Sequence, residues 1–370
     1  MKKKMIKRKK TRKTWPDEAI SQYTGFYSDS YLSFASDDKI RQISASGGTV
    51  SALLLFALEK KLIDGAMVCK TVITEGKVRP QFFIAKTREE ILAARGSKYV
   101  ATQFTKEAIP LIREFQGSLA VVGLPCDITI LQNIIQKDTL LKQKVVFTIA
   151  LFCGHNSQPE LIDHVVAKLE NQAQSKVKSY LFRTGHWRGA LRIIFENGQT
   201  VEKPFSYFSL YQNLYFFAEK KCLYCYDHFG YGADIAIGDL WSLEYKNDPI
   251  KYSGVIVKTE TGKRMMNQCI EAGYLQAQPV SIQKIMNGQK RTALFHYNLS
   301  ARHRAGKLFG LEIPDKIRQK VSWHNYLAAL IVLFNWKWSQ SRRFSRLIWK
   351  TPRMVFKVYL YIFKALESIR

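Results

Sequence analysis

The stretch Leu119–Gly154, LAVVGLPCDITILQNIIQKDTLLKQKVVFTIALFCG, contains two short apolar runs separated by a helical segment. Leu119–Gly123 and Val145–Leu151 have the length and apolar composition of buried strands. Between them, Asp127–Gln136 has the residue spacing of a helix. A strand, a helical crossover and a second strand predict a βαβ unit, whose two strands lie parallel in one sheet. We therefore expect an α/β fold.

Each of these two predicted strands is followed by a cysteine. Cys126 comes shortly after the first strand and Cys153 shortly after the second, and each lies near the start of a predicted helix. The carboxyl ends of parallel neighbouring strands meet at one edge of a sheet, where open α/β sheets bind their ligands. A helix N-terminus also stabilises a thiolate. We expect Cys126 and Cys153 to lie close together.

A second stretch, Lys221–Trp241, KCLYCYDHFGYGADIAIGDLW, holds the only C-x-x-C pair of the sequence, Cys222 and Cys225. A metal ion or an iron–sulfur cluster normally takes four protein ligands, so this pair needs two more thiolates. Cys69 lies inside a predicted strand and Cys269 inside a predicted helix, which is typical of cysteines in the core. Cys126 and Cys153 are the better candidates.

The sequence Ser44–Gly48, SASGG, precedes an apolar helical run. Ser46 is a natural N-cap, and Gly47 and Gly48 would let a ligand approach the backbone closely. The free amides of a helix N-terminus attract phosphate. A serine before a helix is more often only a cap, so this motif alone supports either interpretation.

Several further elements follow from the same patterns. Leu191–Phe195 and Gln199–Lys203, joined at Asn197-Gly198, predict a β-hairpin with a type I′ turn. Residues 15–43 have an irregular or weakly helical pattern. Other strands are predicted at Ala66–Ile73, Gln81–Ala85, Ala233–Ile237 and Val255–Val257, and helices from Pro159, at Phe205–Ala218 and at Thr261–Ala272.

These elements predict a mixed sheet with βαβ units, an α/β or α+β arrangement that carries the cysteine site at the carboxyl ends of its strands. We expect four parts, which are a basic disordered tail (1–14), an N-terminal domain (15–118), a domain with the cysteine cluster (119–289) and a basic helical extension (290–370). At 370 residues the chain is long enough for two domains.

The net charge of +27 is concentrated at the two ends of the chain. Residues 1–13 carry +9 and residues 315–370 carry +10, and the second stretch also holds four of the seven tryptophans. Tyr326–Phe334 is too short to cross a bilayer. Basic amphipathic helices with tryptophan suit an anionic membrane surface, while helices packed on the body or on a partner protein are an equal alternative. Nucleic-acid binding is less favoured. No apolar run follows the basic start, so we expect a cytoplasmic protein, peripheral on the membrane if the tail binds lipid.

The motifs SASGG, GSKY, GLPC, FCG, CLYC and IGDLW occur in one order. This ordered set resembles the beta-subunit family of coenzyme F420 hydrogenases and dehydrogenases over roughly Ile43–Gln289. The resemblance implies an oxidoreductase that contains FAD and a 4Fe–4S cluster. It implies the cluster ligands Cys126, Cys153, Cys222 and Cys225, and FAD contacts from Ser46, Gly47, Gly48 and Lys98. Asp239 matches IGDLW without an assigned role.

The sequence also departs from this family. No cysteine precedes Cys69, so the ferredoxin-like segment of many members is absent from the given sequence, and a redox partner protein must supply or take electrons. The usual Cys-His-Gly appears as Cys153-Gly154-His155. The family also occurs beside surface-polysaccharide genes in bacteria not expected to make the deazaflavin coenzyme F420. The donor, the acceptor and the pathway therefore stay open.

The resemblance implies a mechanism in which the flavin exchanges a hydride and the cluster passes single electrons. Lys98 could hold negative charge on the reduced flavin, or contact a phosphate or form a surface ion pair. His155 and His228 flank the cysteines and are more often structural hydrogen-bond partners. Two other functions compete with this one. In the first, zinc on the same four cysteines only holds domains together. In the second, the basic ends bind a membrane surface and no redox cofactor is present.

Overall fold

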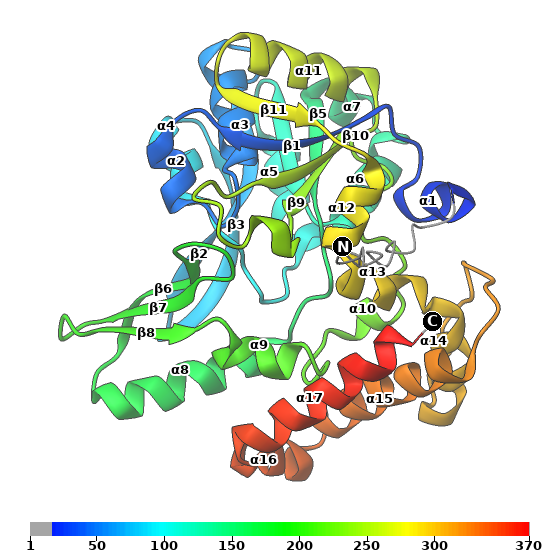
Figure 1. Cartoon of the computed structure of the whole chain (residues 1–370). Helices are drawn as coiled ribbons and strands as arrows, with labels where there is room; N and C mark the ends of the chain where they lie inside the picture. Colours follow the sequence, from blue (N-terminus) through cyan, green and yellow to red (C-terminus); the bar gives the residue numbers. More distant parts are fainter. Residues whose placement is uncertain (1–16, 370) are drawn as a thin grey trace, which may run out of the picture.

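The computed structural model describes residues 17–369, and the basic run 1–14 lies outside them. Its centre is an eight-stranded mixed sheet in the order β11-β1-β10-β9-β5-β4-β2-β3 (Figure 1). The four strands β9, β5, β4 and β2 are parallel, and the others are antiparallel to their neighbours. The bounds are β1 Asp29–Ala35, β2 Gly65–Thr74, β3 Lys77–Ala85, β4 Leu119–Gly123, β5 Val145–Leu151, β9 Ile235–Asp239, β10 Ser253–Val257 and β11 Leu275–Pro279.

The predicted βαβ unit is confirmed. β4 and β5 pair in parallel, with Val122 opposite Ile149, and their bounds agree with the two apolar runs of the sequence. The crossover consists of α6 (Pro125–Ile135) and the short α7 (Thr139–Lys144). α6 begins at Pro125, a residue that suits the first helical position because its missing amide hydrogen has no partner there. Cys126 therefore lies in the first turn of the helix.

The buried strands divide their side chains between two cores, because successive residues of a strand point to opposite faces. Val121 and Ala150 face one core, and Ala120 and Ile149 face the other. The second core is covered by α3 (Thr49–Glu59) and α11 (Glu260–Glu271) (Figure 1). The first core lies against α5 (Phe104–Glu114), α6, α8 (Pro159–Ala173) and the C-terminal helices. Both faces of the sheet are thus buried, which explains the continuous apolar runs.

A second sheet of three antiparallel strands lies beside the first in the order β6-β7-β8 (Figure 1). It is formed by β6 (Val177–Thr184), β7 (Ala190–Phe195) and β8 (Thr200–Pro204). The hairpin is confirmed, but the type I′ turn is wrong. Only Gly198 of the Asn197-Gly198 pair has a positive φ, of 83°, and its amide donates to Phe195 O. The connection is thus a turn followed by a left-handed glycine, a common longer hairpin loop.

The expectation of an irregular or weakly helical segment at residues 15–43 is confirmed for two short helices but missed a strand. This segment contains α1 (Asp17–Thr24), β1 and α2 (Asp38–Ile43), and β1 lies between β10 and β11 inside the sheet. Its sequence, DSYLSFA, is rich in serine, so its apolar alternation is weak. Pairing with strands about 220 to 250 residues away in the sequence stabilises it. Such long-range pairing leaves no local signal.

The predicted helix Phe205–Ala218 is also too long. α9 covers Ser206–Gln212, and the chain then bends through Tyr215 and Phe217, which have φ values of 63° and 58°. The remaining helices of the N-terminal and central parts are α4 (Arg88–Ala93) and α10 (Lys220–Leu223).

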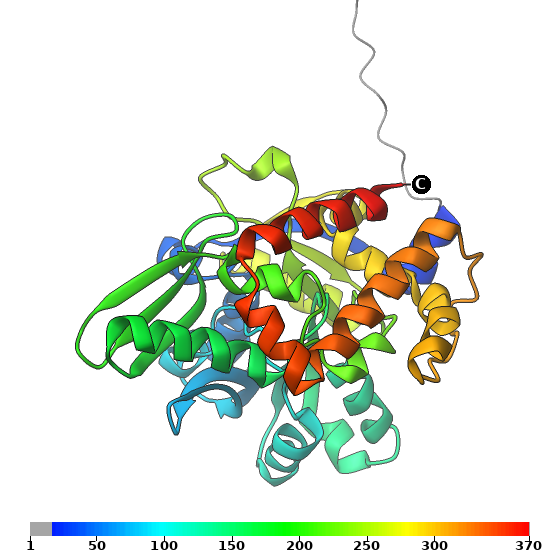
Figure 2. The same cartoon turned by 90° about the horizontal axis from the view of Figure 1, so that it is seen from below.

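Six helices end the described chain. They are α12 (Ile282–Gly288), α13 (Lys290–Tyr297), α14 (Leu299–Gly306), α15 (Trp323–Ser339), α16 (Arg342–Lys350) and α17 (Arg353–Ser368). Figure 2 shows α15, α16 and α17 as an outer layer across one side of the molecule. In residues 17–369, no helix is both long enough and apolar enough to cross a bilayer.

These helices pack on the body of the protein. The Ser339 hydroxyl accepts a hydrogen bond from the Phe217 amide at 2.9 Å, and the Asn335 amide donates to Leu214 O at 2.8 Å. The Trp349 ring stacks on His164 of α8, with 3.7 Å between centroids, and on Phe217. These contacts agree with the alternative in which the tail packs on the body, and they join the extension to the 119–289 region.

Candidate functional site

The four candidate cysteines come from three places at the carboxyl edge of the parallel strands. Cys126 lies in the first turn of α6, Cys153 follows β5, and Cys222 and Cys225 lie in and directly after α10. Burial raises the pKa of Cys126, Cys222 and Cys225 to about 12 and that of Cys153 well above its usual value. The other thiols add to this effect, and Cys153 is influenced by all three. The four sulfur atoms are therefore within electrostatic reach of one another.

The surroundings of the cysteines supply positive charge and hydrogen-bond donors. The Asn156 amide donates to Cys222 Sγ at 3.4 Å, and the Lys221 ammonium stabilises negative charge on Cys126 and Cys222. Arg302 of α14 is about 1% exposed and forms no ion pair with a carboxylate of residues 17–369. An unpaired buried cation is costly unless an anionic group lies nearby. Burial and the neighbouring Asp127 favour neutral thiols, and Lys221 and Arg302 are the groups that oppose this effect.

The Arg302 guanidinium holds the C-x-x-C turn directly. Nε donates to Leu223 O at 2.9 Å, Nη2 donates to Cys225 O at 2.7 Å, and Nη1 donates to Phe295 O. The guanidinium carbon also lies 4.0 Å from the centre of the Phe295 ring. The position of Cys225 thus depends on a side chain 77 residues further along the chain.

Two buried histidines hold the loop that carries Cys153. His228 Nδ1 lies 2.9 Å from Cys153 O, and His296 Nε2 lies 2.7 Å from Gly154 O. Burial lowers the pKa of His228 to about 4 and that of His296 well below its usual value, so both rings are neutral near pH 7. His155 stacks on Tyr215 with 4.5 Å between centroids, and burial lowers its pKa to about 3. These contacts agree with structural roles for His155 and His228.

The two remaining cysteines lie apart from this set. Cys269 is buried in α11, in the other core, and Cys69 is partly buried in β2 next to the Lys98 side chain. Among residues 17–369, no three His, Cys, Asp or Glu side chains are close enough together to hold a single metal ion. That the four sulfur atoms lie within about 7 Å of one another, as a cluster requires, stays a prediction.

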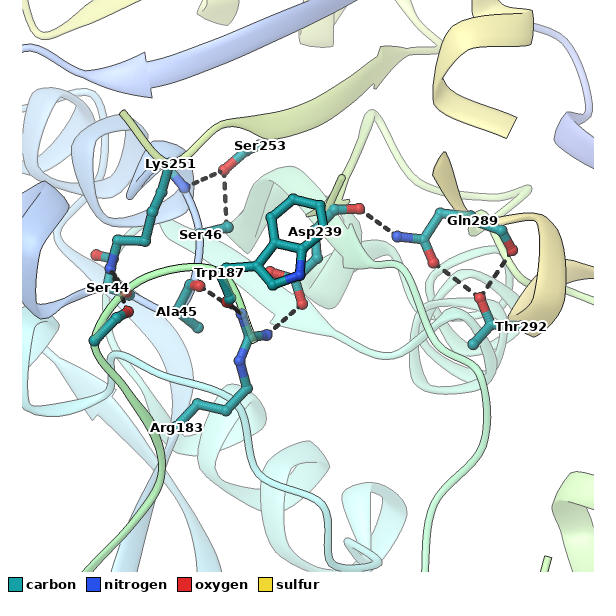
Figure 3. Close-up of polar contacts among 12 residues, drawn as sticks. Ser44, Ala45, Ser46, Arg183, Trp187, Asp239, Lys251, Ser253, Gln289 and Thr292 are labelled. Atoms are coloured by element: carbon teal, nitrogen blue, oxygen red, sulfur yellow. Dashed lines mark hydrogen bonds and ion pairs between the residues drawn. The ribbon is translucent and has the colours of Figure 1, made fainter. Parts of the chain in front are cut away.

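A polar pocket lies around Ser46 (Figure 3). Ser46 Oγ is 2.9 Å from Ser253 Oγ, which also accepts a hydrogen bond from the Gly47 amide at 3.1 Å. Arg183 of β6 reaches the pocket from the second sheet. It forms a 2.5 Å ion pair with Asp239 and donates to Ala45 O at 2.8 Å. The Arg183–Asp239 pair therefore holds the SASGG loop against the end of β9.

Lys251 adds a second cation to this pocket. Its ammonium donates to Ser44 O and to Gln42 O, the latter at 3.3 Å. Burial and the neighbouring Arg183 lower the pKa of Lys251 to about 8. Two cations against one carboxylate leave the pocket positive near pH 7, which suits an anionic ligand.

Both glycines of the SASGG motif are required by the folded structure, for reasons that the sequence did not reveal. A Cβ on Gly47 would meet Ser33 O at 2.5 Å and the Ser253 amide nitrogen at 2.9 Å. Gly48 has a φ of 80° and is itself the N-cap of α3, so the expectation that Ser46 caps this helix is wrong. Ser46 instead bonds to Ser253 of β10, which leaves the N-cap to a left-handed glycine.

Lys98 does not join the serine and glycines through any hydrogen bond or ion pair found in the described structure. Its ammonium donates to Ala94 O, to Arg95 O at 3.3 Å and to Gly96 O at 2.9 Å, so it satisfies carbonyls at the C-terminal end of α4. Burial lowers the pKa of Lys98 to about 8. The next residue, Tyr99, places its hydroxyl beside the Arg183 guanidinium. The GSKY motif thus reaches the pocket through Tyr99.

The cysteine set and the polar pocket are neighbours. β5 and β9 pair in parallel with Leu151 opposite Ile237, so Cys153, just beyond β5, corresponds in position to Asp239, the last residue of β9. Gln289 lies between Asp239 of the pocket and Thr292 of α13 (Figure 3). Its amide donates to Asp239 O, its carbonyl accepts from Thr292 at 2.9 Å, and it lies beside the His228 ring.

Comparison with known proteins identifies the family. Residues 30–107 match the N-terminal part, and residues 117–283 the C-terminal part, of the coenzyme F420 hydrogenase/dehydrogenase beta subunit. The chain belongs to this family. These matches confirm the resemblance seen in the ordered motifs, and they end before α13, so Arg302 and the helices α15–α17 lie outside them.

Relatives of this F420 hydrogenase/dehydrogenase beta-subunit homologue are redox proteins. The chain is 27% identical to the coenzyme F420 hydrogenase subunit beta of Methanosarcina barkeri over 70% of its length and 84% of the relative. It is 26% identical to an F420-dependent formate dehydrogenase 1 subunit beta of Methanococcus maripaludis, over 66% of its length and 60% of the relative. Membership of the family supports an oxidoreductase function.

The fold is shared with a solved member of such a complex. A chain from the F420-reducing NiFe hydrogenase complex of Methanosarcina barkeri superposes with a TM-score of 0.60 at 22% identity, covering 80% of this chain and 98% of that one. This similarity confirms the predicted α/β fold class.

Several residues of the two sites were missed by sequence reasoning. Arg183, Lys251, Ser253, Gln289 and Arg302 carry no motif of their own, and each reaches its site from a distant part of the chain. Asp239 was noted without a role, and its ion pair with Arg183 now gives it one.

Proposed function

We propose that this chain is an oxidoreductase that transfers electrons between FAD in the Ser46 pocket and a 4Fe–4S cluster on Cys126, Cys153, Cys222 and Cys225. One observation carries this proposal. The polar pocket and the cysteine set lie at corresponding positions at the ends of the adjacent parallel strands β5 and β9. A two-electron carrier and a one-electron carrier need this proximity to exchange electrons.

The cysteine set fits a cluster in three respects. It offers four thiols from elements that fold together, an amide that donates to Cys222 Sγ, and the buried cation Arg302 beside the C-x-x-C turn. Thiolate ligands require that the thiols lose their protons, which their burial opposes. The bound metal would drive this loss, and Lys221 and Arg302 would assist it. His228 and His296 hold the backbone of the Cys153 loop and stay neutral, so they add no charge there.

In this proposal the pyrophosphate of FAD binds at the Ser46 pocket. The Ser46 hydroxyl would contact the phosphates, Gly47 and Gly48 would shape the loop that presents it, and Lys251 and Arg183 would balance the phosphate charge. FAD would supply hydride exchange and single-electron transfer. Lys98 is proposed to hold negative charge near the flavin. Its three carbonyl contacts also give it a capping role, so its removal should affect α4 as well.

A redox partner protein completes the proposed electron path, because relatives of this chain are named as subunits of hydrogenases and dehydrogenases. The given sequence carries no cysteine before Cys69 for a second cluster. We place the reaction in surface-polysaccharide biosynthesis, on the basis of the family resemblance alone. The cytoplasmic side of an anionic membrane is the proposed location.

Anaerobic purification of the full chain tests the redox proposal. The protein should contain about four iron and four sulfide per chain together with FAD. Its visible spectrum should show both flavin bands and a broad cluster absorbance that dithionite bleaches. The double variant Cys222→Ser/Cys225→Ser should lose iron but keep FAD. The matched control Cys269→Ser, in the other core, should keep both.

The same measurement separates the alternatives. Stoichiometric zinc without iron or flavin in the anaerobic protein would contradict the redox proposal. It would favour the alternative in which zinc on the same four cysteines only holds domains together. Iron without FAD would retain the cysteine assignment and remove the pocket assignment.

A further inference from the structure

The outer face of α17 exposes a continuous apolar stripe. Met354, Val355, Val358, Tyr361 and Ile362 are between 54% and 70% exposed. At about 100° per residue these side chains fall within an arc of roughly 120° on one side of the helix. The opposite side, with Phe356, Leu360 and Phe363, is buried against the body.

This stripe is part of a wider concentration of exposed apolar side chains. Of the eighteen large hydrophobic residues that are exposed in the described chain, eleven lie between Trp323 and Ile369. The concentration occurs on the layer formed by α15, α16 and α17 (Figure 2). An apolar surface gathered in one region of a protein marks an interaction site.

Basic residues border the stripe. On α17, Lys357 lies on the polar flank of the stripe at helical spacing. The preceding α16 exposes four cations, Arg342, Arg343, Arg346 and Lys350, and none of them pairs with a carboxylate in the described chain. Of the two acids between residues 315 and 370, Glu367 is paired with Arg291, and Asp315 accepts hydrogen bonds from the Ser300 hydroxyl and the Arg318 amide. The charge beside the stripe is therefore uncompensated.

We propose that α16 and α17 dock the protein on an anionic lipid bilayer, with the α17 stripe inserted among the lipid headgroups. Charge complementarity selects this occupant, because unpaired arginines and lysines beside an apolar stripe match an anionic leaflet with an acyl layer beneath it. α17 has 16 residues and lies on the surface of the protein, so it binds in the plane of the membrane. The proposal does not depend on the redox cofactors.

Trp349 orients this face. Its ring is clamped between His164 and Phe217, which ties α16 to the body while the arginines of the same helix remain exposed. The docking face is thus a rigid part of the fold, and the body would be held at a fixed distance from the lipid.

Flotation with vesicles tests the proposal on the full-length protein. Vesicles containing phosphatidylglycerol and phosphatidylcholine should bind it at least about tenfold more tightly than phosphatidylcholine alone, since the exposed arginines and lysines of α16 and α17 are attracted to an anionic surface. Raising the salt concentration should weaken this binding.

Two variants locate the face. Val358→Glu/Ile362→Glu should lower vesicle affinity at least about tenfold, because it places two carboxylates in the stripe. Both substituted residues are exposed, so the core is unchanged. Leu140→Glu, at a residue 69% exposed on α7, is the matched control and should bind as the unmodified protein does. All three proteins should have the same thermal unfolding midpoint.

Two outcomes would overturn the proposal. One is unchanged vesicle binding by Val358→Glu/Ile362→Glu. The other is an oligomer of the unmodified protein, seen by light scattering, that the same variant dissociates while neither protein binds vesicles. That result would assign the stripe to a second copy of the chain.

Discussion

At the scale of single residues, charged side chains from distant segments adjust the two candidate sites. Arg183 and Lys251 set the charge of the Ser46 pocket, and Arg302 sets that of the cysteine site. Each is buried or partly buried, so its interactions are screened less than those of surface charges. Of these three groups, Lys251 has a pKa close enough to neutral pH for ligand binding to depend on pH.

Lys251 makes anion binding in the pocket depend on pH. Its pKa is about 8, so the ammonium is charged at pH 7 and is largely neutral at pH 9. We expect the affinity for FAD, measured by quenching of flavin fluorescence, to fall as the pH rises through 8. A bound anion raises the pKa, which moves the fall to somewhat higher pH.

Lys251→Met is the control for this effect. It should bind FAD several-fold more weakly at pH 7 and should lack the loss of affinity near pH 8. If the unmodified protein shows the same FAD affinity from pH 7 to pH 9.5, Lys251 does not contact the bound anion.

Gly47 should tolerate no side chain. In Gly47→Ala the new methyl would press on the backbone of Ser33 and Ser253, so we expect a loss of about 1–3 kcal/mol in the free energy of unfolding. Bulkier residues at this position are expected to prevent folding rather than only to exclude flavin. Urea unfolding measures the loss.

Gly232→Ala is a matched control, because its Cβ would meet only Gln132 Cγ at an ordinary 3.5 Å. It should change stability by less than about 1 kcal/mol. Equal stabilities of the two variants would contradict the tight backbone approach at Gly47.

At the scale of elements, α14 supports a turn that belongs to another region of the chain. The C-x-x-C turn is short, and α10 spans only four residues, so its own hydrogen bonds cannot hold it rigidly. The Arg302 side chain supplies the missing donors to Leu223 O and Cys225 O. The extension beyond the family match thus contributes to the cysteine site.

Arg302→Met should loosen this turn. Three carbonyl groups would lose their donor, and we expect a cost of about 2–4 kcal/mol in stability and a lower iron content per chain. Iron analysis and urea unfolding are the measurements. Arg291→Met is the control. Arg291 pairs with Glu367 and does not contact the C-x-x-C turn, so this variant should keep its iron.

Arg302→Lys separates charge from geometry. It restores the cation, but a compact ammonium lacks the planar, spread donors with which the guanidinium reaches Leu223 O, Cys225 O and Phe295 O, so a partial recovery of iron is expected. An Arg302→Met protein with the iron content and stability of the unmodified chain would remove this role.

At the scale of the whole molecule, the C-terminal helices cover one core with their inner side and expose apolar and basic residues on their outer side. Their inner side buries Leu333, Trp336, Phe356 and Phe363 in the same core that lies beneath the parallel strands. Their outer side carries the exposed stripe and the basic residues. One layer therefore stabilises the fold and presents the proposed lipid-binding face.

Deletion of residues 315–370 should destabilise the protein. It would uncover the aromatic side chains of Tyr211, Phe216 and Phe217, which pack against Trp349 and Phe356. We expect aggregation during purification or a strongly lowered unfolding midpoint, measured by light scattering and calorimetry. A soluble, monomeric truncated protein with full iron and flavin would show that the tail is a separate unit.

The sequence by itself determined the features that rest on local patterns. The apolar runs at Leu119–Gly123 and Val145–Leu151 and the helix between them predicted the parallel pair β4 and β5. The same logic placed Cys126 and Cys153 at one edge, because strand ends are encoded by the residues that end them. The ordered motifs identified the family. The strand and helix signals lie within short consecutive stretches, and the family was recognised from the order of short motifs between Ser44 and Trp241.

Only the tertiary structure decided how the sites are completed. β1 is recognisable as a strand only through its partners β10 and β11. The backbones of Ser33 and Ser253 leave no room for a side chain at Gly47, and Asp239 forms an ion pair with Arg183 of the second sheet. Arg302 reaches the C-x-x-C turn from beyond the family match. Hydrogen bonds and ion pairs act over a few ångströms, so partners that are dozens to hundreds of residues apart in sequence are chosen by the folded backbone and leave no periodic signal in the chain.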